Sequence, residues 1–168
     1  MAPERTDFAL ACAEQALAWW PRGVRIKSTF LAWGKFSPRF CGMTTGNCLV
    51  TPAGDLSPCY EVLDPGNAQE APYLFGRIDA AGTAPVMDAE KRARISARDV
   101  QAIDACARCP FEYSCAGWCP YKISRAGFGY HDGVDPDACG AIKAGTTRFI
   151  EGIADSDWQD TSVVEMAG

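Results

Sequence analysis

The sequence lacks the long apolar stretch that a membrane-spanning helix requires. No apolar run approaches the roughly 18 to 20 residues that cross a bilayer, and the 168-residue chain is 48% hydrophobic, as in ordinary globular proteins. Residues 1–7 are acidic and polar, and Glu14 and Gln15 interrupt the apolar stretch that follows, which argues against a secretory signal. We therefore expect a cytoplasmic protein made of one domain with a small appendage.

Positive charge is scarce and dispersed. The chain has 16 Lys and Arg against 21 Asp and Glu, a formal net charge of −5, and no cluster of basic residues. Nucleic acids and anionic membranes attract proteins through such clusters, so neither is an expected partner. Histidine is almost absent as well. His131 is the only one and lies in a segment rich in Gly and Asp, so we expect it to be solvated and not a ligand.

Cysteine, by contrast, is abundant, with nine in the chain. Four of them fall within fourteen residues, in the stretch Cys106-Ala-Arg-Cys109-Pro-Phe-Glu-Tyr-Ser-Cys115-Ala-Gly-Trp-Cys119-Pro120. Four thiols this close cannot all form relaxed disulfides with one another, because each bridge needs its own Cα separation and side-chain direction. The Cys-x-x-Cys-Pro opening and the Cys-x-x-x-Cys-Pro close are typical of loops that wrap iron–sulfur clusters. The odd total and the missing signal also favour ligands over disulfides.

Residues 1–38 predict a helix followed by a strand. Residues 8–20 are alanine-rich and helix-forming, and Pro21 and Gly23 end the helix. Residues 24–30 alternate between apolar and polar and predict a half-buried strand. The helix is apolar around most of its circumference, and both edges of the strand are unpaired. We therefore expect this unit to be the end of something larger and to need cover from a partner, so that the isolated chain self-associates through residues 8–31.

The rest of the chain predicts short strands and helices, so the expected fold class is α+β. The elements that we expect are a hairpin of residues 49–51 and 56–60, a strand within 73–78, a helix over 88–105 capped by Asp88, a loop over 121–133, and a helix after Cys139 with a buried apolar face. A cysteine-rich domain over residues 39–155 would hold all of these, followed by an acidic tail over 156–168.

Cys12 lies mid-helix among alanines and is expected to be a buried small side chain. The eight cysteines that remain suit two four-cysteine sites, either cubane clusters or zinc: Cys41, Cys48, Cys59, Cys106, Cys109, Cys115, Cys119 and Cys139. A zinc ribbon usually presents two short Cys-x₂-Cys pairs, whereas Cys41, Cys48 and Cys59 are separated by six and ten residues. Spacing favours iron–sulfur clusters. A non-redox zinc-binding interaction module is the alternative.

The order of the cysteines resembles a known family. Cys41-x₁₂-Gly54-x₄-Cys59, then Cys106-x₂-Cys109-x₅-Cys115-x₃-Cys119, then Cys139 is similar to the seven-cysteine pattern of the SPASM domain. That domain is the C-terminal auxiliary-cluster part of radical S-adenosylmethionine enzymes that mature peptides and sulfatases. The resemblance covers residues 41–139 and implies a hairpin followed by helical segments around two [4Fe–4S] clusters.

The resemblance also implies which thiols ligate which cluster. Cys41, Cys48, Cys59 and Cys119 would hold auxiliary cluster I, and Cys106, Cys109, Cys115 and Cys139 would hold auxiliary cluster II. Cys48 is outside the seven-cysteine pattern, but its place between Cys41 and Gly54 matches members whose first cluster is fully ligated by protein. Full ligation leaves no iron open to substrate, so each cluster would transfer electrons or hold structure.

The Cys-x₃-Cys-x₂-Cys loop that radical S-adenosylmethionine enzymes use to bind and cleave their cofactor is absent from the sequence. The chain is therefore not expected to be catalytically self-sufficient. The resemblance implies that a barrel domain or protein supplies the missing chemistry, in cis or in trans. It further implies a peptide or protein substrate, and a reductant such as a ferredoxin or flavodoxin.

Overall fold

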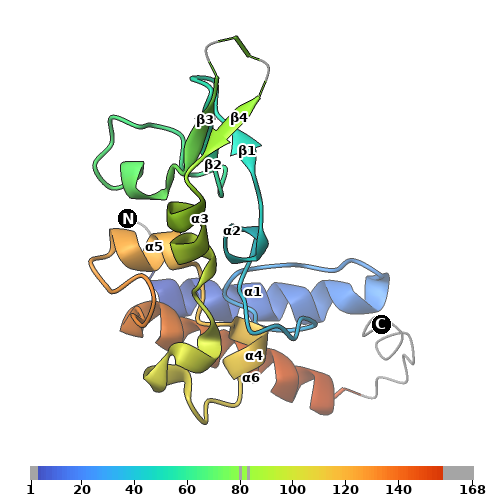
Figure 1. Ribbon diagram of the computed structural model, residues 1–168. Helices are drawn as coiled ribbons and strands as arrows, with labels where there is room; N and C mark the ends of the chain where they lie inside the picture. Colours follow the sequence, from blue (N-terminus) through green and yellow to red (C-terminus); the bar gives the residue numbers. More distant parts are fainter. Residues whose placement is uncertain (1–3, 80, 83, 157–168) are drawn as a thin grey trace.

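The computed structural model describes residues 4–79, 81–82 and 84–156. A pair of long helices lies at one end of the molecule and a small antiparallel sheet at the other, with the short helices and most of the cysteine-bearing segments between them (Figure 1). Helices and an antiparallel sheet occupy different parts of the molecule, so the expected α+β class is confirmed.

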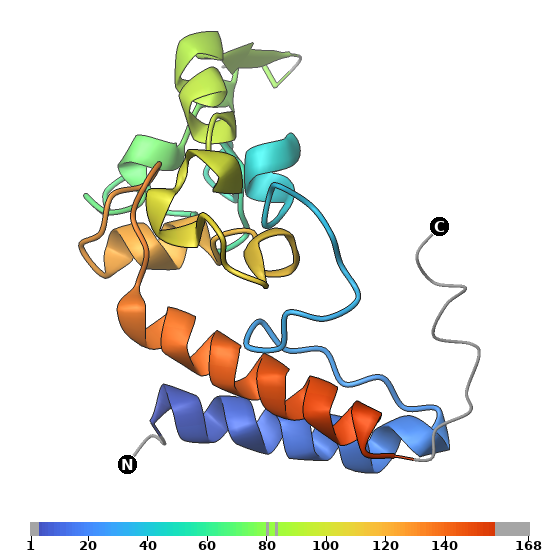
Figure 2. The same ribbon diagram turned by 90° about the horizontal axis from the view of Figure 1, so that it is seen from below.

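The two long helices are α1 (Arg5–Trp19) and α6 (Pro136–Ala154), and they run side by side (Figure 2). Small residues let their backbones approach closely, because Ala9, Ala13 and Ala16 of α1 are all buried. On α6, a Cβ added at Gly145 would lie 2.9 Å from the carbonyl oxygen of Ala9. The alanine-rich sequence that predicts the helix therefore also determines how closely α6 packs on it.

Larger side chains seal the contact between the two helices. Trp20, in the short 3-10 helix η1 (Trp20–Arg22), packs on Phe149 of α6 with their ring centroids 5.7 Å apart. Leu17 and Ile153 add to the same cluster. Burial of one such side chain contributes about 1.5 to 3 kcal/mol. The expectation that this helix finds its cover outside the chain is thus wrong for the face that α6 covers. Phe8 and Trp19 stay 46% and 42% exposed, so the expected self-association stays a prediction.

The strand expected over residues 24–30 does not form. In the described part of the chain the sheet has four strands, and none of them includes these residues. The segment crosses the helix pair instead, with Ile26 packed against the α1–α6 cluster. Phe30 makes an edge-to-face contact with Phe8 of α1, and their ring centroids are 5.8 Å apart. Of the apolar side chains that suggested a half-buried strand, Ile26 and Phe30 are half-buried against helices, whereas Val24 is 46% exposed.

The sheet is an antiparallel meander with the strand order β1-β2-β3-β4. Its strands are β1 (Leu49–Val50), β2 (Asp55–Ser57), β3 (Gly76–Ile78) and β4 (Pro85–Met87). The expected hairpin is confirmed, with Leu49 opposite Ser57 and Val50 opposite Leu56. The strand expected within 73–78 is also confirmed, and it follows a 3-10 turn, η2 (Ala71–Tyr73). Strand β4 was not expected.

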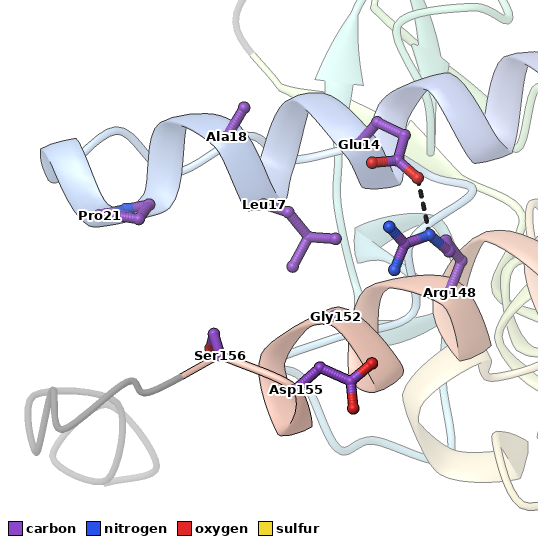
Figure 3. Close-up of a pocket in the computed structure, with 8 residues that line it drawn as sticks. All are labelled: Glu14, Leu17, Ala18, Pro21, Arg148, Gly152, Asp155 and Ser156. Atoms are coloured by element: carbon purple, nitrogen blue, oxygen red, sulfur yellow. Dashed lines mark hydrogen bonds and ion pairs between the residues drawn. The ribbon is translucent and has the colours of Figure 1, made fainter.

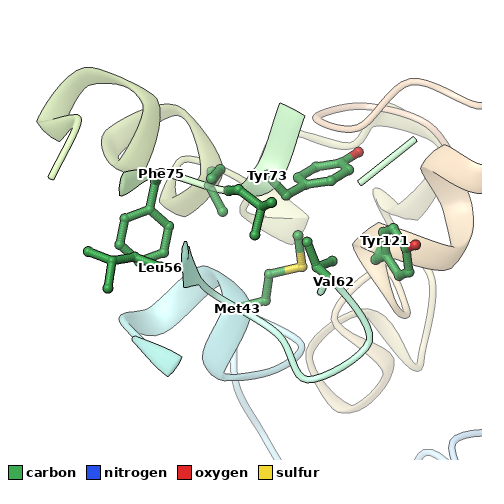
Figure 4. Close-up of a cluster of buried hydrophobic side chains, with 8 residues drawn as sticks. Met43, Leu56, Val62, Tyr73, Phe75 and Tyr121 are labelled. Carbon is green, nitrogen blue, oxygen red and sulfur yellow. The ribbon is translucent and has the colours of Figure 1, made fainter. Parts of the chain in front are cut away.

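A compact apolar cluster joins the sheet to the short helices (Figure 4). Leu56 and Phe75 come from the sheet side, Met43 from α2 (Gly42–Thr45) and Tyr121 from α5 (Pro120–Arg125). Each of these four side chains is at most 2% exposed. This cluster fixes the hairpin relative to the loop that contains Cys119.

Four further segments lie between the sheet and the helix pair: α3 (Ala89–Ser96), η3 (Val100–Ala102), η4 (Asp104–Cys106) and α4 (Glu112–Cys115). Asp88 caps α3 as expected, since its carboxylate accepts a hydrogen bond of 2.8 Å from the backbone N–H of Lys91. The single helix expected over 88–105 is wrong, because it ends at Ser96 and Asp99 caps the new turn η3.

Two smaller expectations near the C-terminal end of the chain also need correction. The expected loop over 121–133 begins with helix α5, since Pro120 occupies its first turn. Cys139 does not precede a helix, because α6 already begins at Pro136 and Cys139 lies in its first turn. Most of the acidic tail predicted over 156–168 falls outside the described residues.

Candidate metal centre

Four cysteines from separate segments line one small pocket. Cys106 ends η4, Cys109 follows it in the loop, Cys115 ends α4 and Cys139 lies in the first turn of α6. We call these four residues the loop–helix group. They are the four that the resemblance assigns to auxiliary cluster II. The first three are close in sequence, whereas Cys139 reaches them only through the fold.

The loop that contains the first three thiols is tightly folded. The backbone N–H of Cys109 donates to the carbonyl oxygen of Cys106 at 2.9 Å, and Arg108 between them has a φ of 65°. The N–H of Glu112 returns to Cys109 at 3.0 Å and starts α4. Successive turns of this kind bring the thiols of a short segment toward a common space, as an iron–sulfur loop requires.

The thiols of the loop–helix group affect one another electrostatically. The pKa of Cys115 is raised to about 12, chiefly by burial and also by the charges of Cys106, Cys139 and Cys109, while a hydrogen bond from the backbone N–H of Trp118 lowers it. The pKa of Cys106 is raised by burial and then by Cys139 and Cys109. Four thiolates in this pocket would repel one another. A bound metal ion or cluster would offset that repulsion, because a thiol that coordinates a metal loses its proton and shares its negative charge with the metal.

A second set of thiols gathers at the edge of the apolar cluster of Figure 4. Cys41 precedes α2, Cys59 follows β2, and Cys119 precedes α5, and all three are partly buried against that cluster. We call them the hairpin group. The charge of Cys41 contributes to the raised pKa values of both Cys59 and Cys119, after burial as the largest cause. Thiols that are 18 and 60 residues apart in sequence thus meet here.

Backbone N–H groups point at two sulfurs of the hairpin group. The N–H of Glu61 donates to the Sγ of Cys59 at 3.5 Å. The N–H groups of Lys122 and Tyr121, at the start of α5, hydrogen-bond to Cys119 and lower its pKa against the effect of burial. Hydrogen bonds to sulfur stabilise the thiolate and tune the potential of a bound cluster.

The chain reverses direction between the two groups. Ala116, Gly117 and Trp118 have positive φ values of 50°, 69° and 60°, three left-handed residues in succession. Such conformations are costly for residues other than glycine. They separate Cys115 from Cys119, so that the first joins the loop–helix group and the second joins the hairpin group. This is the division of the dense loop that the resemblance implies.

Three residues named from the sequence lie outside both groups. Cys48, implied as the fourth ligand of cluster I, is exposed just before β1 and does not pack on the apolar cluster with the other three. Cys12 is partly exposed on α1, where the sequence predicts a buried side chain. His131 is exposed, and its ring makes an edge contact with Tyr130 at a centroid distance of 4.9 Å.

The thiols do not converge on a single point. All nine cysteines belong to the described residues and none is in a disulfide. In that part of the chain no group of three or more His, Cys, Asp or Glu side chains has the geometry to hold one metal ion. A zinc ion needs four sulfurs about 2.3 Å from one centre, which the loop–helix group does not provide as it stands.

The size of the pocket limits what it can take without rearrangement. The cavity of the loop–helix group measures about 20 Å³, close to the room of a single water molecule. The donor set of four thiols fits a cubane, which uses one cysteine for each iron. A cubane is larger than this cavity, so the walls of the pocket would have to move apart to admit it.

A larger pocket lies elsewhere and contains none of the cysteines. It measures about 460 Å³ at the end of the helix pair (Figure 3). Its lining residues are Glu14, Leu17, Ala18, Pro21, Arg148, Gly152, Asp155 and Ser156. Glu14 and Arg148 form an ion pair of 2.7 Å across its mouth. The size of this pocket does not make it the site, because the groups that can bind a metal lie around the smaller cavity.

Arg98 is a component of the site region that the sequence did not reveal. Its side chain is 3% exposed and bonds to the turn between Cys115 and Cys119. In the sequence it lies within the helix expected over 88–105, where nothing distinguishes it from the other charged residues.

Among the described residues, no helix combines the length and the apolar character needed to cross a bilayer. Comparison with known proteins found no match to a family model, a curated protein or a solved structure. The thiol groups and the cysteine spacing are therefore the observations on which a function can be built.

Proposed function

We propose that this chain binds two [4Fe–4S] clusters and serves as the SPASM-type part of a radical S-adenosylmethionine enzyme system. One observation carries the proposal. Cys139 lies in one pocket with Cys106, Cys109 and Cys115, although 23 residues separate it from the nearest of them in sequence. The cysteine spacing is a feature of the sequence, and this grouping is a feature of the packing between distant segments.

The hairpin group, which contains the last cysteine of the dense loop, supports the same proposal. Cys119 packs on the same apolar cluster as Cys41 and Cys59, its proposed partners in cluster I. It does not line the pocket of Cys115, although both cysteines pack on a second apolar cluster around Trp118 and Ile142. Cys48 is the proposed fourth ligand. Because it is exposed and apart from the apolar cluster, it has the least structural support of the eight.

In this role the residues of the chain would hold the two clusters and limit their contact with water. Eight thiolates would use every iron position of two cubanes, so the clusters would carry electrons and not bind substrate. A partner barrel would supply the cofactor cleavage, and a peptide would be the substrate. Either electron transfer or placement of that peptide would be the contribution of this chain.

Anaerobic reconstitution of the full chain with iron and sulfide tests the proposal. We expect about eight irons and eight acid-labile sulfides per chain, from four cysteines per cubane, with a brown colour and broad absorbance near 400 nm. A colourless protein that holds about two zinc ions and no sulfide would replace this proposal with the zinc-binding module. Cys12→Ala is the matched control, since Cys12 belongs to neither thiol group and its loss should leave the iron content unchanged.

A further inference from the structure

Arg98 is a buried cation held by backbone carbonyl groups. It is 3% exposed, and its guanidinium donates to the carbonyl oxygens of Gly117 at 2.9 Å, of Gly133 at 3.2 Å, and of Tyr130. Its buried Nε has no hydrogen-bond partner among the described residues. No ion pair involves Arg98 in the part of the chain that the structure describes.

A charge in this position is costly unless something negative compensates it. Transfer of an unpaired charge from water into the protein interior is strongly unfavourable. Hydrogen bonds to three neutral carbonyl groups offset only part of that cost. Burial lowers the pKa of Arg98, and the groups that raise it again are Tyr130, Cys106, Asp132 and Cys115. Two of these four are thiols of the loop–helix group.

Arg98 also holds the turn between the two thiol groups. Gly117, which accepts one of its hydrogen bonds, is the middle of the three left-handed residues between Cys115 and Cys119. A Cβ at Gly117 would lie 2.7 Å from the Cδ1 of Ile103 and 3.1 Å from Nη2 of Arg98. The guanidinium therefore lies directly against the backbone of this turn, at the side of the cysteine pocket.

We infer that Arg98 is a positioning residue of the loop–helix site whose positive charge compensates the negative charge of its four thiolates. The inference rests on the proposed function and goes beyond it, because it assigns the tuning of one cluster to a residue that is not a ligand. Reduction by one electron adds one negative charge to the site, so a nearby fixed cation stabilises the reduced state and raises the potential.

The test compares three variants of the full reconstituted chain: Arg98→Gln, Arg98→Lys and Arg94→Gln. Gln removes the charge but can still donate to a carbonyl group, whereas Lys keeps the charge without the planar fork. Arg94 is an exposed arginine of α3, one turn before Arg98, and serves as the control for a general change of charge. Iron and sulfide are counted first. Both clusters are then titrated with dithionite as the one-electron donor and followed by electron paramagnetic resonance.

The cluster of the loop–helix group is identified by its absence from Cys109→Ala. In Arg98→Gln we expect its reduction equilibrium constant to fall about tenfold, a shift of about 59 mV to lower potential for one electron. The potential of the other cluster should stay near its wild-type value in Arg98→Gln. In Arg98→Lys and Arg94→Gln the potentials of both clusters should stay near wild type.

An unchanged potential in Arg98→Gln overturns the inference, as does an equal shift in Arg98→Lys. Failure of both Arg98 variants to load this cluster also overturns it, because Arg98 would then be only a structural clamp. A wild-type chain without sulfide is a different result, which refutes the proposed function itself and this inference with it.

Discussion

Arg5 in the first turn of α1 donates a hydrogen bond to the carboxylate of Asp135, with 2.5 Å between Nη1 and Oδ2, across 130 positions of sequence. The same carboxylate caps α6, because its Oδ1 accepts from the backbone N–H groups of Asp137 and Ala138 at 3.1 and 3.2 Å. One buried side chain thus ties the N-terminal helix to the turn of α6 that carries Cys139.

Loss of the Asp135 carboxylate should destabilise the protein. Asp135→Ala removes the N-cap of α6, which costs about 0.5 to 2 kcal/mol, and also removes the partner of Arg5. Because Arg5 is partly exposed, the ion pair itself adds less than about 1 kcal/mol. Urea denaturation should show a lower midpoint with an unchanged slope. Asp137→Ala is the control, since its side chain is exposed in the same turn. A midpoint equal to wild type in Asp135→Ala would contradict the role of the cap.

Acid should weaken the same contact. Burial alone would raise the pKa of Asp135, but hydrogen bonds from Arg5 and the N–H of Ala138, together with the charge of Arg5, lower it below the ordinary value of 3.8. A lowered pKa stabilises the folded state above that ordinary value, and the contribution is lost as pH falls through the lower, folded pKa. The difference in unfolding free energy between wild type and Asp135→Asn should therefore shrink below about pH 4. A difference that stays constant from pH 7 to pH 2 would argue against it.

The close contact of the helix pair should reject even one added methyl group. Gly145→Ala places a Cβ 2.9 Å from the carbonyl oxygen of Ala9 and 3.1 Å from that of Phe30, so we expect a loss of about 1 to 3 kcal/mol. Gly140→Ala, also in α6, meets nothing within 4 Å and should be neutral or stabilising by up to about 1 kcal/mol. Thermal unfolding of the two variants measures the contrast. Equal midpoints would mean that α1 and α6 are not packed as described.

Cys119→Ala should distinguish a division by sequence from a division by fold. Cys119 belongs to the dense loop in sequence but lies with Cys41 and Cys59 in space. We therefore expect it to remove the same cluster signal as Cys59→Ala and to leave the signal that Cys109→Ala removes. Resonance spectra of the three reconstituted variants decide this. If Cys119→Ala matches Cys109→Ala instead, the assignment of thiols to two groups is wrong.

Cys48→Ala tests the weakest member of the proposed ligand set. If Cys48 completes the hairpin site, the variant should lose that cluster or convert it to a form with fewer than four irons, since one corner iron would lack its thiolate. Total iron should then fall from about eight toward four or seven per chain, by this count of one ligand per iron. Full iron content with an unchanged spectrum would remove Cys48 from the site.

Local features of the chain could be predicted from sequence because they depend on neighbouring residues. The alanine-rich run specifies α1, the segment between Val50 and Asp55 specifies the hairpin turn, and Asp88 specifies the start of α3. The cysteine spacing belongs to the same class of information. This spacing argues against disulfides within the dense loop without any knowledge of three-dimensional contacts.

Predictions that required knowledge of distant neighbours were wrong or out of reach. The alternation over residues 24–30 is compatible with a strand, but a strand needs a neighbouring strand to pair with. Ile26 packs against the cluster between α1 and α6 instead. The cover of α1 comes from α6, more than a hundred residues away. Arg98 was out of reach, because its role depends on carbonyl groups at Gly117, Tyr130 and Gly133.

The sequence by itself determined that this protein has eight thiols suited to two sites, and that four of them share one loop. A division of those thiols came only as an expectation from the resemblance, and the tertiary structure decided which of them lie close together. Cys139 joins the loop because Asp135 and α1 hold the start of α6, and Cys119 leaves it because three left-handed residues reverse the chain. Spacing limits which thiols can meet, whereas packing between segments far apart in sequence selects those that do.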